Sequence, residues 1–379
     1  MRFRRLALAA LAAVLGGAAL AETVPSTGGG EGPPPPPPGS IAYRPVVEAA
    51  IDRVIVPGYR ALAEAADAEA ASIATLCKAP GAASLDAARA GFARLVQAWS
   101  RVEMYRMGPA RDANRTERLF FWPDRKGLGQ RQVDGILASG DAGATDVASL
   151  RQKSVAVQGL LALEALIAGD GSAALADGPA DSFRCRYAAT VAAAVALTAR
   201  EILDGWTAPD GFAAVMRNAG PDNPVFRAQG EVVQDLLRAM REQLQMVREL
   251  KIARVIGDTP AAATPTRAPF WRSNQAIPAI VANLEAIIDL NDRGGLAAAL
   301  PKGFEWAGPS LDFELRQAIR ALDAVAATGK PWPDAVRDPA SHQRLAYSLI
   351  PTGSALDMLA GSYVTGLGLI AGFNSQDGD

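Results

Sequence analysis

Apolar residues recur along most of this chain with the 3.6-residue period of an α-helix, and this pattern limits its fold more than any other feature. Alanine is abundant, and aromatic residues make up only 6% of the chain. No segment alternates polar and apolar residues as a half-buried strand would. Segments rich in glycine, proline and aspartate separate the periodic stretches. The pattern predicts an all-α protein with helices near residues 43–77, 84–106, 145–168, 182–205, 224–256, 270–291, 310–328 and 341–372.

Two of these helical segments repeat one pattern. QGLLALEALI begins at Gln158, and QAIRALDAVA begins at Gln317. Both segments start with glutamine, share an alanine-leucine pair and carry an acid at the same place. This internal duplication predicts two related halves, each resembling a four-helix bundle, which cover residues 41–210 and 211–379.

The first residues have the composition of an export signal. MRFRR is positively charged, LALAALAAVLGGAA is apolar, and a cleavage site of the A-x-A type ends at Ala21. We therefore expect residues 1–21 to be a cleaved signal peptide and the mature protein to be periplasmic or secreted, with no membrane insertion after cleavage. Residues 22–40 contain six consecutive prolines and are predicted to be a disordered linker. The alternative is a ligand for a proline-recognition module.

The charge balance and the cysteine count narrow the class of protein. The chain has 38 basic and 40 acidic residues, and the predicted signal peptide contains three arginines but no acid. A weakly acidic protein is a poor candidate for binding nucleic acid or an anionic membrane surface. The two cysteines, Cys77 and Cys185, predict one disulfide in an oxidising compartment, and two buried thiols are the alternative.

Most catalytic motifs are absent from the sequence. His342 is the only histidine, so the chain can form neither an H-E-x-x-H zinc site nor a site of three histidines. It also has no G-x-S-x-G elbow, no phosphate-binding loop and no dinucleotide-binding fingerprint. Metal binding by carboxylates alone stays open, although no spacing of acids points to it.

Glu164 lies on a helix that is apolar on nearly all sides. Leu160 and Leu161 share its face of that helix, and a buried carboxylate is costly unless something pairs with it. In the second half, Arg320 lies three residues before the corresponding Asp323 and can pair with it. Because Glu164 has no such cation on its own face, its partner must come from another helix, a loop, a water molecule or a ligand.

The nearest supply of a partner is the segment from residue 97 to 127. It interleaves arginines with aromatic residues, and loops of this composition often shape ligand sites. The alternative is a loop that its aromatic residues pin to the core while its arginines stay solvated. We expect Arg106, Arg118 or Arg125 to pair with Glu164, with the Trp122 indole as a neutral donor.

Four features together resemble the imelysin family: the export signal with a duplicated helical body, WSRVEMYRMGP followed by FFWPDR, the helix GLLALE, and the ending GFNSQDGD. The family's motif is G-x-H-x-x-E, and Gly159 and Glu164 match its first and last positions. Leu161 occupies the position of the histidine, and leucine has no lone pair to bind a metal ion. The resemblance implies two helical-bundle halves with a pocket near their interface, a peptidase label with a proposed metal site, and a link to iron uptake.

These observations lead to one functional hypothesis. We expect a periplasmic, non-catalytic binding protein associated with iron or metal acquisition, and the alternative is an imelysin-type metallopeptidase with ligands other than histidine. The expected partners are a small ligand or a metal ion such as iron, and components of iron uptake. Glu164 is the one candidate metal ligand, and no zinc site is expected. The candidate pocket residues are Trp99, Glu103, Arg106, Arg118, Trp122, Asp124, Gln158, Gly159 and Glu164.

Overall fold

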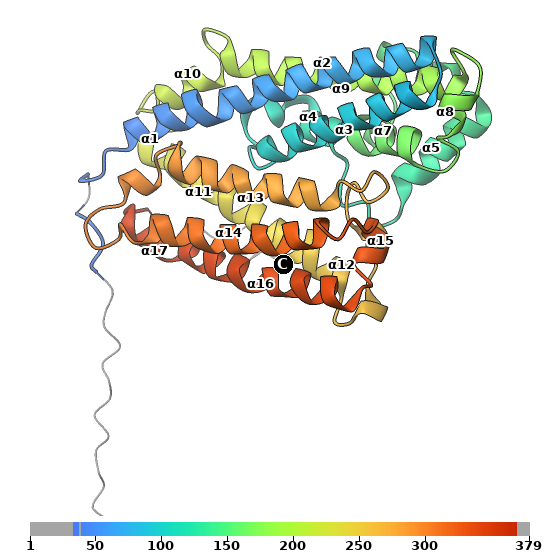
Figure 1. Cartoon of the computed structure of the whole chain (residues 1–379). Coiled ribbons are helices and arrows are strands. Elements are labelled where there is room, and N and C mark those ends of the chain that lie inside the picture. Colours follow the sequence, from blue (N-terminus) through green and yellow to red (C-terminus); the bar gives the residue numbers. More distant parts are fainter. Residues whose placement is uncertain (1–32, 38, 370–379) are drawn as a thin grey trace, which may run out of the picture. The chain divides into compact units, whose positions relative to one another are not determined.

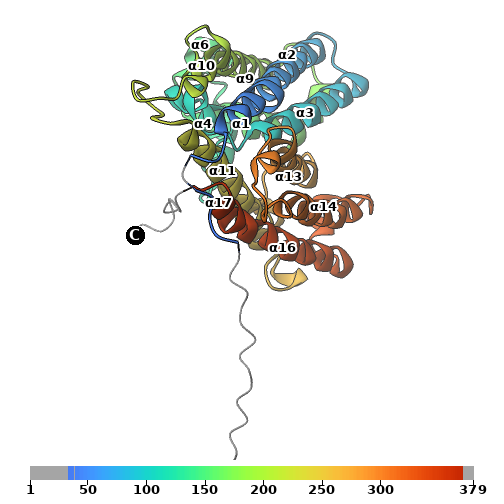
Figure 2. The ribbon, with the colours of Figure 1, turned by 90° about the vertical axis from the view of Figure 1, so that its left-hand side faces the viewer.

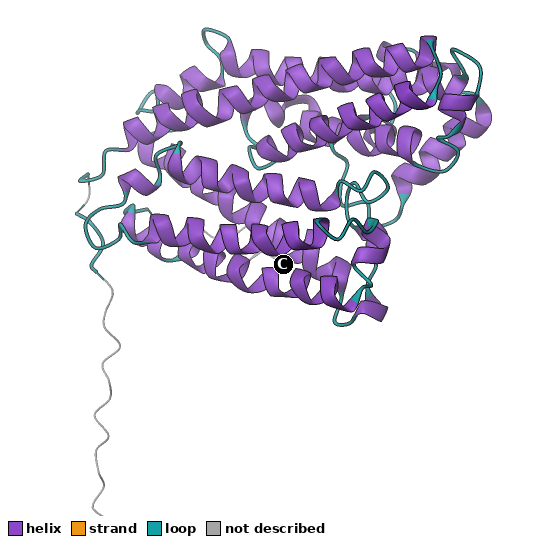
Figure 3. Ribbon diagram, viewed as in Figure 1, coloured by secondary structure: helices purple, strands orange, loops and turns teal. Residues whose placement is uncertain are grey.

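The computed structural model describes residues 33–37 and 39–369. The predicted signal peptide, most of the linker and the GFNSQDGD ending lie outside these residues. All regular structure in the described residues is helical (Figure 3), as the periodicity predicts. None of the described helices is long and apolar enough to cross a membrane.

Long antiparallel helices build the first part of the fold. The chain enters α1 (Tyr43–Ala50), passes through a π-helical turn (Ile51–Ile55) and continues in α2 (Val56–Lys78). It returns along α3 (Ala82–Val102), and α9 (Phe183–Thr207) then packs along α2 (Figure 1). The shorter elements between α3 and the second part are α4 (Arg115–Leu119), α5 (Leu128–Ser139), α6 (Val147–Arg151), α7 (Gly159–Ala168), α8 (Ala174–Asp177) and α10 (Phe212–Arg217).

A second set of long helices follows. The helix α14 (Ala307–Ala326) packs along α16 (Pro339–Ala360), and α13 (Ala276–Asp292) packs against both α14 and α3, which places α13 between the two sets (Figure 2). The helix α11 continues into a π-helical segment, Met246–Ala253, before it ends. The helices of this set are α11 (Gln229–Gln245), α12 (Arg254–Ile256), α13 (Ala276–Asp292), α14 (Ala307–Ala326), α15 (Trp332–Ala335), α16 (Pro339–Ala360) and α17 (Ser362–Gly366).

The chain from Pro35 onward forms one compact unit by its contacts. The proposed division into two duplicated halves near residue 210 therefore stays a prediction.

The start of α16 shows how a side chain caps a helix. Asp338 precedes α16, and its carboxylate accepts a hydrogen bond from the backbone N–H of Ser341 at 3.0 Å. Such an N-cap satisfies one of the free N–H groups at the start of a helix.

Two of the predicted helices are wrong in extent. The segment predicted as a single helix over 145–168 is broken, because Gln158 has an extended backbone and Gly159 has a φ of +79°. The helix α5 was not predicted, because its apolar residues are few and two glycines interrupt them. The helix predicted from residue 270 begins at Ala276, since Phe270 and Asn274 adopt positive φ angles.

The predicted disulfide is confirmed. Cys77 at the end of α2 is bonded to Cys185 in the first turns of α9, with a Cα–Cα distance of 5.5 Å. The bond joins residues 108 positions apart, so it closes a long loop that contains α3 to α8. A crosslink of this span removes much conformational freedom from the unfolded chain.

Candidate functional site

Glu164 is fully buried in the middle of α7. Its Oε1 accepts two hydrogen bonds from Ser273, one from the backbone N–H at 2.9 Å and one from the hydroxyl at 2.7 Å. Its Oε2 is buried and accepts no hydrogen bond. Burial raises the pKa of the Glu164 carboxyl, although the bonds from Ser273 and the charge of Arg272 act in the opposite direction. The backbone N–H of Arg272 also lowers this pKa, so Oε2 is buried in the wall beside a polar group and is not open to solvent.

The partner of Glu164 differs from the prediction. No arginine of the segment 97–127 contacts it; the donor is Ser273, which precedes α13 in the second set of helices. The analogy with the repeat also fails, because Asp323 is exposed and the Arg320 guanidinium donates to Gln317 instead. A loop with positive φ angles at its ends presents its backbone N–H to Glu164, and no cation is needed to satisfy that oxygen.

A cavity of about 560 Å³ opens beside Glu164. Its walls come from three segments: residues 121–133, residues 156–165 on and before α7, and residues 250–272. Glu164 and Leu161 both line it, so the position that carries histidine in the family motif faces the same cavity as the glutamate that ends that motif. Ligand sites of proteins commonly have this volume and combine apolar walls with a few polar groups.

Aromatic side chains form one part of the cavity wall. Phe121 and Trp122 come from the loop before α5, and Phe270 and Trp271 come from the loop before α13. The Trp122 indole N–H donates to the backbone carbonyl of Arg267 at 3.2 Å, which ties the two loops together. Behind them, the Phe120 ring stacks on both Trp122 and Phe270, at centroid distances of 6.0 and 5.3 Å. This packing fixes the aromatic wall.

Four arginines also line the cavity: Arg125, Arg254, Arg267 and Arg272. Among the residues that the structure describes, none of the four guanidinium groups forms an ion pair or a hydrogen bond with a side chain. The guanidinium of Arg272 lies 4.4 Å from the centre of the Trp271 ring, a cation–π contact. The cavity therefore concentrates positive charge in a protein whose overall charge is weakly negative.

Asp124 is the second acid of the cavity, and both of its oxygens accept hydrogen bonds from the backbone. Its Oδ1 accepts from the backbone N–H of Leu128 at 2.9 Å, and its Oδ2 accepts from that of Gly129 at 2.7 Å. The carboxylate thus serves the start of α5, where the free N–H groups and the helix dipole favour a negative charge.

Two further candidates, Glu103 and Arg106, belong to a charged network around the buried Lys251, and a third, Trp99, packs nearby. Glu103 is fully buried at the end of α3, and its carboxylate contacts the Lys251 ammonium at 2.6 Å. Asn283 of α13 contacts both groups, and the Arg106 guanidinium lies 3.6 Å from Glu103. Burial alone would raise the pKa of Glu103, but the charges of Lys251 and Arg106 hold it below its usual value. The ring of Trp99 packs on Phe120 nearby.

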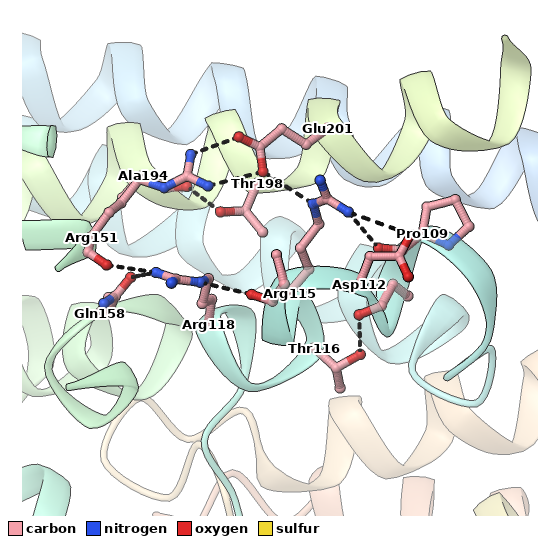
Figure 4. A network of polar contacts seen from close by, with 12 residues as sticks. Pro109, Asp112, Arg115, Thr116, Arg118, Arg151, Gln158, Ala194, Thr198 and Glu201 are labelled. Atoms are coloured by element: carbon pink, nitrogen blue, oxygen red, sulfur yellow. Dashed lines mark hydrogen bonds and ion pairs between the residues drawn. The ribbon is translucent and has the colours of Figure 1, made fainter. Parts of the chain in front are cut away.

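The remaining candidates hold the start of α7 in place. The Arg118 guanidinium donates to the carbonyl of Arg151 at 2.8 Å and to the side chain of Gln158 at 3.3 Å (Figure 4). At Gly159, a Cβ atom would lie 2.3 Å from the carbonyl oxygen of Arg118, so only glycine fits between α4 and α7. The glycine and the glutamate of the motif therefore have different roles. Gly159 allows the backbones of α4 and α7 to approach closely, and Glu164 lines the cavity.

The structure thus brings together Trp122, Asp124 and Glu164 at the cavity, and it places the other six candidates in the two supporting networks. Sequence reasoning missed Trp271, Arg254, Arg267 and Arg272, which come from the second set of helices. A signal was present. The segment TRAPFWR, residues 266–272, has the same mixture of arginine, aromatic residues and proline as FFWPDR.

The donors around Glu164 do not suit a resident metal ion. In the described part of the chain, no three His, Cys, Asp or Glu side chains gather where they could hold one. At the cavity itself, Leu161 replaces the histidine, both oxygens of Asp124 are engaged, and four cationic side chains repel a cation. We therefore derive no chemistry from a protein-bound metal.

The helical fold and the cavity beside a G-x-x-x-x-E segment define an all-α protein with a ligand-sized site. A comparison with models of protein families matches residues 55–356 to imelysin, which carries the label of a peptidase family. The chain therefore belongs to the imelysin family. A search of curated protein sequences gave no match.

Two solved structures share the fold. An imelysin-like protein from Psychrobacter arcticum 273-4 superposes with a TM-score of 0.70 at 18% identity, covering 87% of this chain and 97% of that one. A protein described as an iron-regulated protein A precursor, from Parabacteroides distasonis ATCC 8503, has a TM-score of 0.73 at 15% identity and covers 88% and 98%. At these identities the likeness concerns the fold.

Proposed function

We propose that this protein is an exported, non-catalytic binding protein that holds a small ligand in the cavity beside Glu164 and acts in or beside iron acquisition. The observation that carries the proposal is the state of Glu164, which is fully buried, faces the cavity and keeps one oxygen without a hydrogen bond. A buried acid at the wall of a cavity of about 560 Å³ with apolar and aromatic lining is typical of a ligand site.

Leu161 supports a role in binding over a role in hydrolysis. The family motif would place histidine here, one helical turn before Glu164 and on the same cavity wall. Activation of a water molecule for peptide hydrolysis needs a metal ion or a general base with a suitable partner. Leu161 supplies neither, while it adds apolar surface that suits an organic ligand.

The link to iron is part of the proposal. It is supported by membership of the imelysin family and by the similar structure described as an iron-regulated protein A precursor. The positively charged signal-like segment at the start of the sequence supports action outside the cytoplasm. We infer that the protein meets its ligand in the periplasm and passes it to components of iron uptake.

Growth under iron limitation tests this function. A strain that lacks the gene should grow more slowly than its parent when an iron chelator is added, and the wild-type gene should restore growth. Leu161→Trp, which fills the cavity, should not restore growth. Leu197→Trp is the control, because Leu197 is 37% exposed on α9 and does not line the cavity.

Two results would contradict the proposal in different ways. Equal growth of the deletion strain and its parent would remove the link to iron. Full restoration by Leu161→Trp, with normal amounts of protein, would show that the cavity is not needed. In addition, hydrolysis of casein by the purified protein, lost in Glu164→Gln, would favour the metallopeptidase alternative.

A further inference from the structure

We infer that the cavity selects a small organic anion that carries at least two acidic groups, a flat apolar body and a hydrogen-bond donor. This inference rests on the proposed function, because it names the chemical class of the ligand that the cavity would bind. A neutral apolar molecule, a bare metal ion and an organic cation are the classes that it excludes. Three independent features of the cavity lead to it.

The first feature is the charge of the walls. Among the described residues, Arg125, Arg254, Arg267 and Arg272 form no ion pair, while many other arginines of this protein do. Glu201, for example, lies between Arg115 and Arg151, within 3.1 Å of both (Figure 4). Four guanidinium groups around one cavity favour carboxylate or similar groups, which accept paired hydrogen bonds from arginine.

The second feature is the aromatic wall. Trp122 and Trp271 come from different loops, and the hydrogen bond from the Trp122 indole to the backbone of Arg267 holds these loops together. The guanidinium of Arg272 already stacks on Trp271 at 4.4 Å, so a flat ligand can contact an aromatic face and a cation at the same place. A saturated polyacid would use the charge of this site but not its rings.

The third feature is the free oxygen of Glu164. Two acids, Glu164 and Asp124, line the cavity with the four arginines, and a hydrogen-bond donor on the ligand would offset the repulsion between Glu164 and an anion. Oε1 already accepts two hydrogen bonds from Ser273, whereas Oε2 accepts none. A donor on the ligand would therefore bind to Oε2. A hydroxyl or amino group on the ligand would satisfy it and fix the orientation of the acidic groups toward the arginines. The volume of about 560 Å³ accommodates a molecule of this kind.

Four simple probes test the inference on the purified mature protein, with tryptophan fluorescence and calorimetry as readouts. Hydroxyisophthalate has two carboxylates, a ring and a phenolic donor; isophthalate lacks the donor; tricarballylate has three carboxylates and no ring; benzenedimethanol has a ring and no charge. We expect hydroxyisophthalate to bind most tightly, roughly tenfold more tightly than isophthalate, as one hydrogen bond to a charged group allows. Its affinity should fall as salt is added.

Variants assign the effect to this cavity. Arg254→Gln and Arg272→Gln should each weaken hydroxyisophthalate binding by about tenfold, and Arg344→Gln, an exposed arginine of α16 away from the cavity, should not change it. Glu164→Gln should reduce the preference for hydroxyisophthalate over isophthalate, because a neutral amide oxygen accepts a weaker hydrogen bond than a carboxylate does. Unchanged melting temperatures of the arginine variants show that they fold.

Two outcomes would overturn the inference. One is binding of benzenedimethanol as tight as that of the dianions, without dependence on salt. The other is no binding of either dianion at millimolar concentration. If Leu161→Trp still fails to support growth in iron limitation while neither dianion binds, the proposed function stands and only the ligand class is wrong.

Discussion

The buried pair of Glu103 and Lys251 gives the sharpest prediction about stability. Both side chains are fully buried, and their charged atoms lie 2.6 Å apart between α3 and the π-helical segment that follows α11. Glu103→Gln leaves the Lys251 ammonium without a counter-charge, and Asn283 offers it only one neutral oxygen. Removal of one member of a buried ion pair costs about 3–5 kcal/mol, because the other charge stays in a medium of low polarity. We expect this loss in the free energy of unfolding.

Urea unfolding, followed by circular dichroism of the helices, measures this loss. Lys251→Met should cost somewhat less than Glu103→Gln, because Arg106 and Asn283 still contact the Glu103 carboxylate. The double variant Glu103→Leu with Lys251→Met should recover most of the loss, since it removes both charges together.

A surface pair serves as the control for this experiment. Arg238 and Asp235 lie 2.8 Å apart on α11, and their side chains are 54% and 29% exposed. Arg238→Gln should change the free energy of unfolding by about 1 kcal/mol or less. Two results would contradict this expectation. One is a loss in the free energy of unfolding for Glu103→Gln that is no larger than the loss for Arg238→Gln. The other is a loss for the double variant that equals the sum of the two single losses.

Three further predictions concern other buried features. Burial raises the pKa of Glu69 to about 9, so the folded protein keeps a proton that the unfolded chain loses above its ordinary pKa of 4.5, and stability falls as the pH rises through this window. In urea unfolding, the free energy of unfolding of Glu69→Gln should therefore rise relative to that of the parent by about 1.4 kcal/mol for each unit by which the pH is raised in this window. The variant Glu64→Gln, at an exposed position, should show no such trend. Reduction of the Cys77–Cys185 bond should lower the free energy of unfolding by about 5 kcal/mol in the chain-entropy model, and thiol titration of the denatured, unreduced protein should find no free thiol. Gly159→Ala should lower the melting temperature clearly, since its Cβ would meet the Arg118 carbonyl at 2.3 Å and φ is +79°.

The long helices could be predicted from the sequence because their apolar periodicity is strong. The region between α3 and α9 could not, because its structure depends on tertiary contacts. There the chain needs an extended Gln158 and a left-handed Gly159 so that α7 can pass close to α4. A helical pattern that runs through such a glycine gives no sign of the break.

The burial of Glu164 could be predicted, but its partner could not. An acid within an apolar helix must be satisfied, and the search for a cation led to the nearest arginines. The actual donors are a hydroxyl and a backbone N–H of Ser273, and every residue type except proline has such an N–H. The path of the loop between Phe270 and Asn274 directs the Ser273 N–H toward Glu164. That path cannot be predicted from the types of the side chains.

Only one wall of the cavity could be expected from the sequence. Its first wall, with Trp122, Asp124 and Arg125, lies in the segment that stood out by its composition. Its second wall comes from residues 250–272, more than a hundred positions away in the sequence. Distant segments of one chain meet through the packing of α13 on α3, and no local pattern encodes that meeting.

We propose that the Glu164 cavity binds an organic anion and does not hold a bare metal ion. Equilibrium dialysis of the mature protein, in parallel against zinc ion, ferrous ion and hydroxyisophthalate, tests it most directly. We expect saturable retention of hydroxyisophthalate, near one equivalent per chain, and no retention of either metal ion. Retention of one equivalent of zinc or ferrous ion that disappears in Glu164→Gln, with no retention of the dianion, would contradict it.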